Sequence, residues 1–188
     1  MGHDCAPPEA IPEVLAMRFL LLDRILRLEE GKEAVVRKNV TNSEDYFADH
    51  FADRPIMPGC LVLETCDQAA RLLLGKSAGF ALLPSLESVA SGKFQHFVLP
   101  GDSLEVHVVI VRQTPDGAEV RVSASVENRA VARASLTYRL EKATDDPEAA
   151  RACKRMREFY RVLTTDLLDA AKEYQTRGAV SGREVEGV

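Results

Sequence analysis

The segment CLVLETCDQAARLLL, from Cys60 to Leu74, sets the architecture of this chain. It is rich in Leu and Ala and apolar on nearly every side, so it predicts a helix that is buried all round. Pro58 lies near its first turn and Gly75 follows its last residue, which is the usual placement of proline and glycine at helix ends. Its polar members are Glu64, Thr65, Asp67, Gln68 and Arg71.

Strand patterns stand on both sides of this helix. Before it, the apolar runs Phe19–Leu28 and Ala34–Val40 are separated by a turn, which predicts a hairpin. After it, apolar and polar residues alternate over 104–110, 120–126 and 130–138. A period of two indicates antiparallel strands with one buried face. We therefore predict an α+β chain whose sheet wraps around the helix, although periodicity alone leaves other α+β arrangements open.

The composition is that of an ordinary globular chain. Its 188 residues, 46% hydrophobic and 28% charged, suffice for one domain with an appendage. A net charge of −5 gives no global field that attracts nucleic acid, and no apolar run is long enough to span a membrane. The four cysteines show no CxxC spacing and the first residues lack a signal-peptide pattern. We expect a cytoplasmic protein without disulfides, metal or another cofactor.

The composition changes after Leu140. The run Asp145-Asp146-Pro147-Glu148 is a helix start, and apolar residues then recur at spacings of three and four. This heptad stripe predicts a long helix and consists of Cys153, Met156, Tyr160, Leu163, Leu167, Ala170 and Tyr174. We expect a body over 1–141, a helical extension over 142–176 and a disordered tail over 177–188.

The residues that can carry chemistry lie between His50 and Gln68. Histidine titrates near neutral pH and is the commonest general base. Glu64 is set in a nearly all-apolar helix, where a buried carboxyl group must be paired or protonated, and a protonated glutamate is a general acid. The helix start at Gly59 and Cys60 offers unpaired N–H groups that can polarise a carbonyl oxygen.

Together these groups fit the removal of water from a 3-hydroxyacyl thioester. His50 would take the proton next to the carbonyl, and Glu64 would protonate the leaving hydroxyl group. Each residue also has a structural interpretation, with His50 as a surface histidine and Glu64 as a glutamate that reaches solvent or pairs with an arginine. Structural roles are expected for the other groups of the helix: Gln68 as a hydrogen-bond donor to Glu64, Asp67–Arg71 as an i,i+4 salt bridge, and Cys60 and Cys66 as core residues.

The stretch from His50 to Ala70 resembles the signature of the bacterial 3-hydroxyacyl-[acyl-carrier-protein] dehydratases. That signature runs His-Phe-x-Gly-x-Pro-(Ile/Val)-x-Pro-Gly and precedes an apolar helix that bears the acid. The matching residues are His50-Phe51, Pro55-Ile56, Pro58-Gly59 and Glu64, with Gln68-Ala69 following the acid. Further matches at 19–24, 31–32, 38–41, 93–94 and 100–104 extend the resemblance over roughly residues 17 to 141.

The resemblance implies a hotdog fold and an obligate homodimer, in which His50 of one subunit meets Glu64 of the other in a tunnel at the interface. It implies a hydro-lyase that converts (3R)-3-hydroxyacyl thioesters, carried on acyl carrier protein in the cell, into trans-2-enoyl thioesters of fatty acid, lipid or polyketide biosynthesis. The substrate contacts that it implies are Phe51, Pro58, Gly59, Cys60 and Gln68.

Departures from the family pattern keep other functions open. Ala52-Asp53 replaces the usual Pro-Gly, and residues 15–18 replace a stretch whose tyrosine often gates the tunnel, which favours a specialised paralogue. One alternative is a dehydratase that also isomerises the double bond, but that subfamily usually has aspartate where Glu64 stands. A thioesterase and a catalytically inactive acyl-binding subunit are the others.

Basic residues gather near the start of the C-terminal helix, where Arg151, Lys154, Arg155, Arg157 and Arg161 face a single acid, Glu158. An acidic acyl carrier protein would be attracted to such a surface through salt-sensitive contacts. We expect Arg155 and Arg157 to add to carrier affinity. The alternative is that these arginines form the solvated face of a helix that packs on the body.

Overall fold

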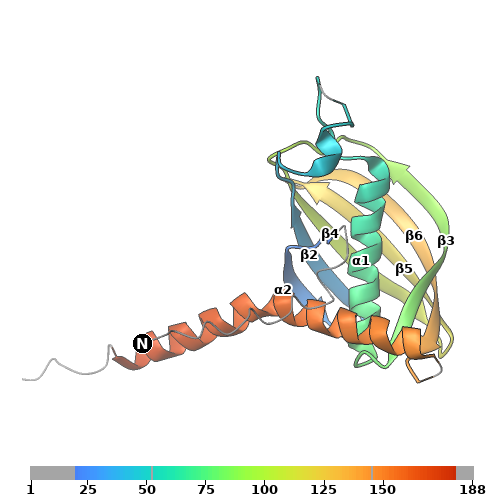
Figure 1. Ribbon diagram of the computed structural model, residues 1–188, viewed down its shortest axis with the longest axis vertical. Coiled ribbons are helices and arrows are strands. Elements are labelled where there is room, and N and C mark those ends of the chain that lie inside the picture. The colour runs from blue at the N-terminus through green and yellow to red at the C-terminus, as the bar shows by residue number, and fades with distance from the viewer. Residues whose placement is uncertain (1–19, 52, 145, 181–188) are drawn as a thin grey trace, which may run out of the picture.

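The computed structural model describes residues 20–51, 53–144 and 146–180, with the side chains of the last helix described up to Thr164. Six antiparallel strands form one sheet in the order β1-β2-β4-β5-β6-β3. They are β1 Arg24–Glu29, β2 Glu33–Asn39, β3 Leu82–Phe94, β4 Ser103–Gln113, β5 Gly117–Val126 and β6 Arg129–Lys142. The sheet curves around helix α1, Gly59–Ser77, and helix α2, Pro147–Val180, crosses its open side (Figure 1). The predicted hotdog fold is therefore confirmed.

Helix α1 is the centre of the hydrophobic core. Its buried apolar side chains are Val62, Cys66, Ala69, Ala70, Leu72, Leu73 and Leu74. Alternate residues of the long strands meet them from the sheet, among them Val106 and Val108 of β4 and Val120 and Val122 of β5. Burial of such surface contributes about 25 cal/mol per Å² and is the main stabilising contribution to the fold. The predicted hairpin, the three later strands and the buried helix are all found.

The end of α1 differs from the prediction. Gly75 lies inside the helix, which continues to Ser77, and the left-handed residue that follows is Gly79 with φ of 59°. A Cβ atom at Gly75 would collide with Sδ of Met156. The glycine therefore allows α2 to approach the backbone of α1 closely and does not terminate the helix.

Strand β3 was not predicted from the sequence. It has no apolar and polar alternation, because its residues from Leu86 onward are exposed on both faces. It pairs with β6 across two irregularities, between Leu86 and Ser88 and between Val89 and Ser91. It also forms one edge of the described sheet, so it presents a row of backbone groups that another strand can pair with.

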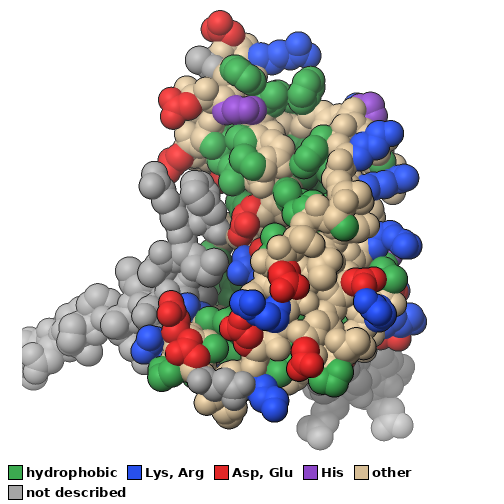
Figure 2. Space-filling view, turned by 90° about the vertical axis from the view of Figure 1, so that its right-hand side faces the viewer, with side chains coloured by type: hydrophobic (Ala, Val, Ile, Leu, Met, Phe, Trp, Pro, Cys, Tyr) green, Lys and Arg blue, Asp and Glu red, His purple; other side chains and the backbone are tan. Residues whose placement is uncertain are grey.

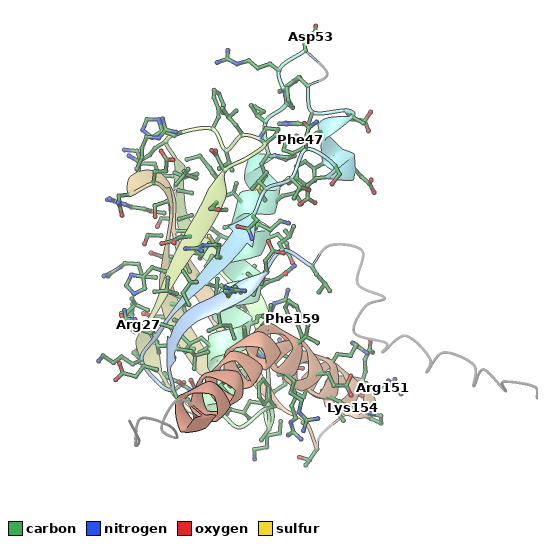
Figure 3. The ribbon with its side chains drawn as sticks, turned by 90° about the vertical axis from the view of Figure 1, so that its left-hand side faces the viewer. Arg27, Phe47, Asp53, Arg151, Lys154 and Phe159 are labelled. Atoms are coloured by element: carbon green, nitrogen blue, oxygen red, sulfur yellow. The ribbon has the colours of Figure 1, made fainter. Side chains whose placement is uncertain are left out.

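Helix α2 begins as predicted, because the Asp146 carboxylate accepts a hydrogen bond from the N–H of Ala149 at 3.1 Å. Cys153 and Leu163 are buried, and Met156 and Tyr160 are partly buried against the core. The later members of the heptad stripe lie outside the described side chains. The helix contacts α1, β1 and β3, and Figure 3 shows Phe159 directed toward the body. Within the described ranges, no helix is long and apolar enough to cross a membrane.

One polar contact joins α1 to β6 inside the core. The Tyr138 hydroxyl group donates a hydrogen bond of 2.7 Å to the Asp67 carboxylate, and Arg71 forms an ion pair of 2.9 Å with the same carboxylate. The predicted i,i+4 salt bridge is thus confirmed. Asp67 is 5% exposed, and burial raises the pKa of its carboxyl group although Arg71 and Tyr138 oppose the shift.

The raised pKa of Asp67 predicts a pH-dependent contribution to stability. In the unfolded chain this carboxyl group ionises near its ordinary pKa of about 3.9, before it does so in the folded protein. Its contribution to the free energy of unfolding is therefore full below that pH and is lost as pH rises through the folded pKa. Urea titrations from pH 4 to pH 8 should show the stability of the wild type, relative to Asp67→Asn, falling with rising pH. The exposed Asp116→Asn variant controls for the loss of a carboxylate.

Candidate functional site

His50 is held by three hydrogen bonds in the loop that follows the short 3-10 helix η2, Asp45–Phe47. Its N–H donates to the carbonyl of Tyr46 at 3.0 Å, and its own carbonyl accepts from the N–H of Ile56 at 3.1 Å. Its Nδ1 atom lies 2.9 Å from the Ile56 carbonyl oxygen. Because a carbonyl oxygen can only accept, Nδ1 carries the proton and Nε2 keeps a free lone pair. The loop thus fixes the ring with Nε2 as its basic atom.

The start of α1 presents donors without acceptors. Pro58 precedes the helix with an extended backbone, and its carbonyl accepts from the N–H groups of Leu61 and Val62 at 2.9 and 3.1 Å. Within the described residues, the N–H groups of Gly59 and Cys60 have no acceptor. The ring of Phe94 lies 3.6 Å from the position of a Cβ at Gly59. The two N–H groups are therefore available to a carbonyl oxygen beside an aromatic ring.

Two sequence expectations about α1 are corrected. Cys60 is exposed and not in the core, whereas Cys66 is buried. Glu64 is not buried within one chain, since 38% of its side chain is exposed.

Glu64 is held by neighbours on its own helix. Its Oε1 atom accepts hydrogen bonds from Gln68 Nε2 at 2.9 Å and from Arg71 Nη2 at 3.4 Å. The side-chain oxygen Oε1 of Gln68 in turn accepts a hydrogen bond from the buried N–H of Leu21 at 3.0 Å. This contact directs the side-chain nitrogen Nε2 of Gln68 toward Glu64. The expected Gln68 contact is confirmed. Arg71 is shared by two carboxylates, since it also pairs with Asp67.

The sequence did not indicate every part of this network. Tyr138 was placed on a buried strand face, but nothing in the pattern linked it to Asp67, and the Leu21 contact involves a backbone group. In the described part of the chain, no hydrogen bond or ion pair joins His50 to Glu64. The same residues contain no group of three or more His, Cys, Asp or Glu side chains suited to a metal ion.

The two arginines expected to dock a carrier lie in different surroundings. Arg157 donates to the carbonyl of Gly79 at 3.2 Å, and its guanidinium lies 5.8 Å from the centre of the Phe80 ring. It therefore holds the turn after α1. Arg155 lines a cavity together with Arg71.

A patch of exposed hydrophobic side chains, the β3-edge patch, runs from β3 to the loops that follow it and to the His50 loop. It consists of Phe51, Leu86, Val89, Phe94, Phe97 and Leu99, of which Phe51 is 58% and Phe97 62% exposed. Figure 2 faces this edge and shows hydrophobic side chains gathered over its upper half beside a histidine. Exposed apolar surface of this extent marks an interaction site.

Comparisons of sequence agree with the fold. The FabA-like domain family matches residues 14–135. The chain is 38% identical over 131 residues to the 3-hydroxyacyl-[acyl-carrier-protein] dehydratase FabZ of Pediococcus pentosaceus, covering 68% of this chain and 88% of that protein. It is 39% identical over 135 residues to the FabZ of an Anaeromyxobacter species, covering 68% and 85%.

Solved structures support the fold alone, because their sequences are distant. Streptococcus mutans smu.793, solved with acetyl CoA, has a TM-score of 0.54 at 18% identity and is matched over 71% of this chain and 98% of its own. A hypothetical thioesterase of Streptococcus pneumoniae, solved with coenzyme A, has a TM-score of 0.52 at 19% identity over 63% and 85%. On the strength of the sequence matches, this chain belongs to the FabA-like family, the family of the 3-hydroxyacyl-[acyl-carrier-protein] dehydratases.

Proposed function

We propose that this chain is a cytoplasmic hydro-lyase that removes water from (3R)-3-hydroxyacyl thioesters on acyl carrier protein and forms trans-2-enoyl thioesters for fatty acid or related lipid biosynthesis. The observation that carries the proposal is the fixed ring of His50, whose Nε2 is free because Nδ1 faces the Ile56 carbonyl. Its relatives named as 3-hydroxyacyl-[acyl-carrier-protein] dehydratases support the choice of substrate.

In the first half of the reaction, Nε2 of His50 takes the proton from C2 of the substrate. The electrons of that bond move toward the thioester carbonyl, which gains negative charge. The free N–H groups of Gly59 and Cys60 donate to this oxygen, and the partial positive charge of the helix start stabilises it further. Phe51, Pro58 and Phe94 would line the substrate beside these donors.

In the second half, Glu64 acts as the general acid and gives a proton to the 3-hydroxyl group. The C3–O bond breaks, water leaves, and a double bond forms between C2 and C3. The carboxylate that remains is the acceptor of the Gln68 and Arg71 hydrogen bonds, so these two residues stabilise the charge that Glu64 acquires. Return of the proton from His50 to Glu64 through solvent restores the enzyme.

A homodimer would complete the site. Among the described residues, no hydrogen bond or ion pair joins His50 to Glu64, and 38% of the Glu64 side chain is exposed. Edge pairing of β3 with its copy would bury the β3-edge patch and continue the sheet. His50 of one subunit would then serve the Glu64 of the other.

The other candidate functions have less support. A dehydratase that also isomerises its product shares the fold and the reacting groups, so it stays a second candidate that product analysis resolves. The hypothetical thioesterase of Streptococcus pneumoniae shares the fold at 19% identity, which supports the fold and not a thioesterase activity. An inactive acyl-binding subunit does not require the bonds that orient His50 and Glu64.

Substitution of either reacting residue should abolish most of the turnover. Loss of a positioned acid or base costs about 100- to 10,000-fold in rate. The turnover rates of His50→Ala and Glu64→Gln should each fall by that factor, while their melting temperatures stay unchanged. Enoyl absorbance with a 3-hydroxyacyl thioester measures the rate. The exchange His107→Ala, at a histidine that pairs with Glu33 elsewhere on the sheet, is the matched control. A near-wild-type rate in either variant would remove that residue from the mechanism.

Subunit exchange tests the shared site. A heterodimer of one His50→Ala chain and one Glu64→Gln chain would contain one intact site and one with neither group. We expect about half of the wild-type activity per heterodimer, because one of two equivalent sites is whole. Purification with two different tags verifies the heterodimer. An inactive heterodimer would show that both groups act within one chain.

We further propose that the basic residues of α2 attract the carrier protein. Because Arg155 and Arg157 also contact the body, reversal of their charges would disturb packing, so the test uses their exposed neighbours Arg151 and Lys154 (Figure 3). The double change to Glu should raise the KM for carrier-bound substrate by about 10-fold at low salt and leave a pantetheine thioester unaffected. Equal effects on both substrates would remove the docking role.

A further inference from the structure

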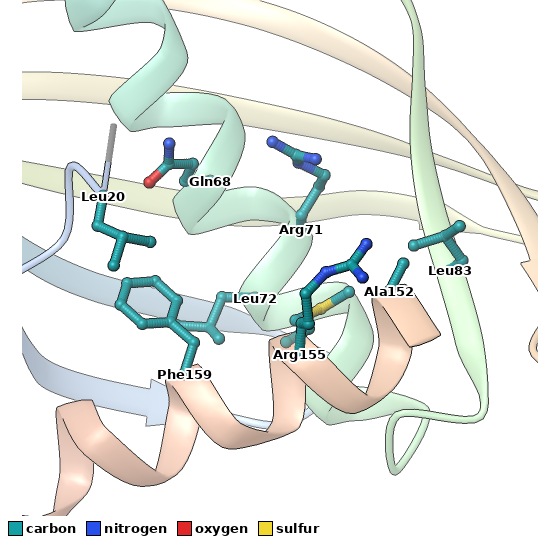
Figure 4. A pocket seen from close by; sticks show the side chains of 9 residues that line it. Leu20, Gln68, Arg71, Leu72, Leu83, Ala152, Arg155 and Phe159 are labelled. Carbon is teal, nitrogen blue, oxygen red and sulfur yellow. The ribbon is translucent and has the colours of Figure 1, made fainter. Parts of the chain in front are cut away.

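A cavity of about 140 Å³ lies between α1, α2 and β3 (Figure 4). Its wall is mostly apolar, with Leu72 from α1, Leu83 from β3, and Met156 and Phe159 from α2. Figure 4 shows the ring of Phe159 directed toward Leu20 and Leu72 across the cavity. The apolar part of this lining suits a hydrocarbon chain.

The cavity adjoins the surroundings of Glu64 through two shared residues. Gln68 and Arg71 form its polar wall, and both also hydrogen-bond the Glu64 carboxylate. On α1, its lining runs from Gln68 to Leu72, the fourth and the eighth residues after Glu64. With a rise of about 1.5 Å per residue, it covers the helix from roughly 6 to 12 Å beyond the acid.

The floor of the cavity comes from helix α2, which lies outside the region that the family match covers. The FabA-like match ends at residue 135, whereas Ala152, Met156 and Phe159 come from the helix that begins at Pro147. Gly75 lets Met156 settle on α1, so the floor is built into the packing of the two helices. The cavity is therefore a feature of this chain and not of the matched region alone.

We propose that this cavity receives the methyl end of a medium-length acyl chain, and that Phe159 and Met156 set the longest chain that the enzyme accepts. The proposal rests on the proposed function. Three bonds of an extended chain span about 3.3–3.6 Å, so 6 to 12 Å beyond C3 corresponds to roughly five to ten further bonds. A cavity of about 150 Å³ is known to hold a six-carbon ring, which agrees with the lower part of that range. The preferred acyl chain has about eight to thirteen carbons.

The position of the Arg155 charge bears on whether the cavity binds a methyl or a carboxylate chain end. No ion pair of its guanidinium is found among the described residues, and Figure 4 shows it extending from α2 toward the gap between α1 and Leu83. The arginine stem lines the cavity while its charged end reaches that gap, as long cationic side chains commonly do. The bottom of the cavity, at Phe159 and Leu72, carries no charge, and this favours a methyl end over a carboxylate end.

The test makes the cavity shallower in one variant and deeper in another. Phe159→Trp fills the cavity and should lower kcat/KM for 3-hydroxydecanoyl thioester about 10-fold, without effect on the four-carbon 3-hydroxybutyryl thioester. Phe159→Ala deepens it and should raise the ratio of kcat/KM for fourteen-carbon over ten-carbon substrate about 16-fold, the gain expected when two of the four extra methylene groups become buried at a factor of about four each. Val162→Ala, 62% exposed on the same helix, is the matched control.

A variant on strand β3 repeats the test without a change in helix α2. Leu83→Phe narrows the cavity from β3 and should reproduce the selective loss seen with Phe159→Trp. Equal losses for all chain lengths in both variants would overturn the proposal, and so would preference for a decanoyl chain that ends in a carboxylate over one that ends in methyl.

Direct binding separates this inference from the proposed function. Isothermal titration calorimetry of the wild-type chain measures binding without any change in the cavity wall. A heat of binding is expected with decanoyl-pantetheine and not with acetyl-pantetheine, even if no dehydration is detected. A lack of response in a protein that dehydrates 3-hydroxybutyryl thioester would reject the cavity while leaving the activity in place.

Discussion

The packing of α1 against the inner face of the sheet supplies the apolar burial on which the rest of the structure depends. One helix fills the concavity of six strands, so its residues must be apolar on most of its circumference. The sheet in turn needs this helix to cover its inner face, because strands with one apolar face are not stable in water. Helix and sheet therefore form together, and the positions of Gly59 and Glu64 follow from that packing.

The same helix must also carry polar groups, and the structure accommodates them in two ways. On the buried side, the Asp67 carboxylate receives the Tyr138 hydroxyl group and the Arg71 guanidinium, which compensates for part of its lost hydration. On the open side, Glu64 takes hydrogen bonds from Gln68 and Arg71. Arg71 thus couples a structural carboxylate to the proposed acid, and a change at either one alters the charge that the other faces.

Helix α2 extends the fold across the open side of the core. Gly75 removes the side chain that would keep the two helices apart, and Met156 occupies the space. The contact closes a cavity whose upper wall belongs to the surroundings of Glu64. In the opposite direction, the exposed edge of β3 leaves a second surface open, and its apolar side chains adjoin the His50 loop. The two surfaces suit two roles, one in chain-length selection and one in dimer formation.

The sequence by itself determined the elements whose pattern is periodic and the residues whose motif is local. It predicted α1, five of the strands and the start of α2, because burial of one face imposes a repeat that can be counted. It also placed His50 and Glu64 in one motif and identified the Gln68 contact, which spans a single helical turn. The tertiary structure alone decided the rest. Strand β3 lacks a buried face and so has no pattern, and Gly75 was assigned to a helix end because its partner Met156 lies far away in sequence. The exposure of Glu64 and the tie between Asp67 and Tyr138 depend on which surfaces other elements cover, and a one-dimensional pattern contains no information about that.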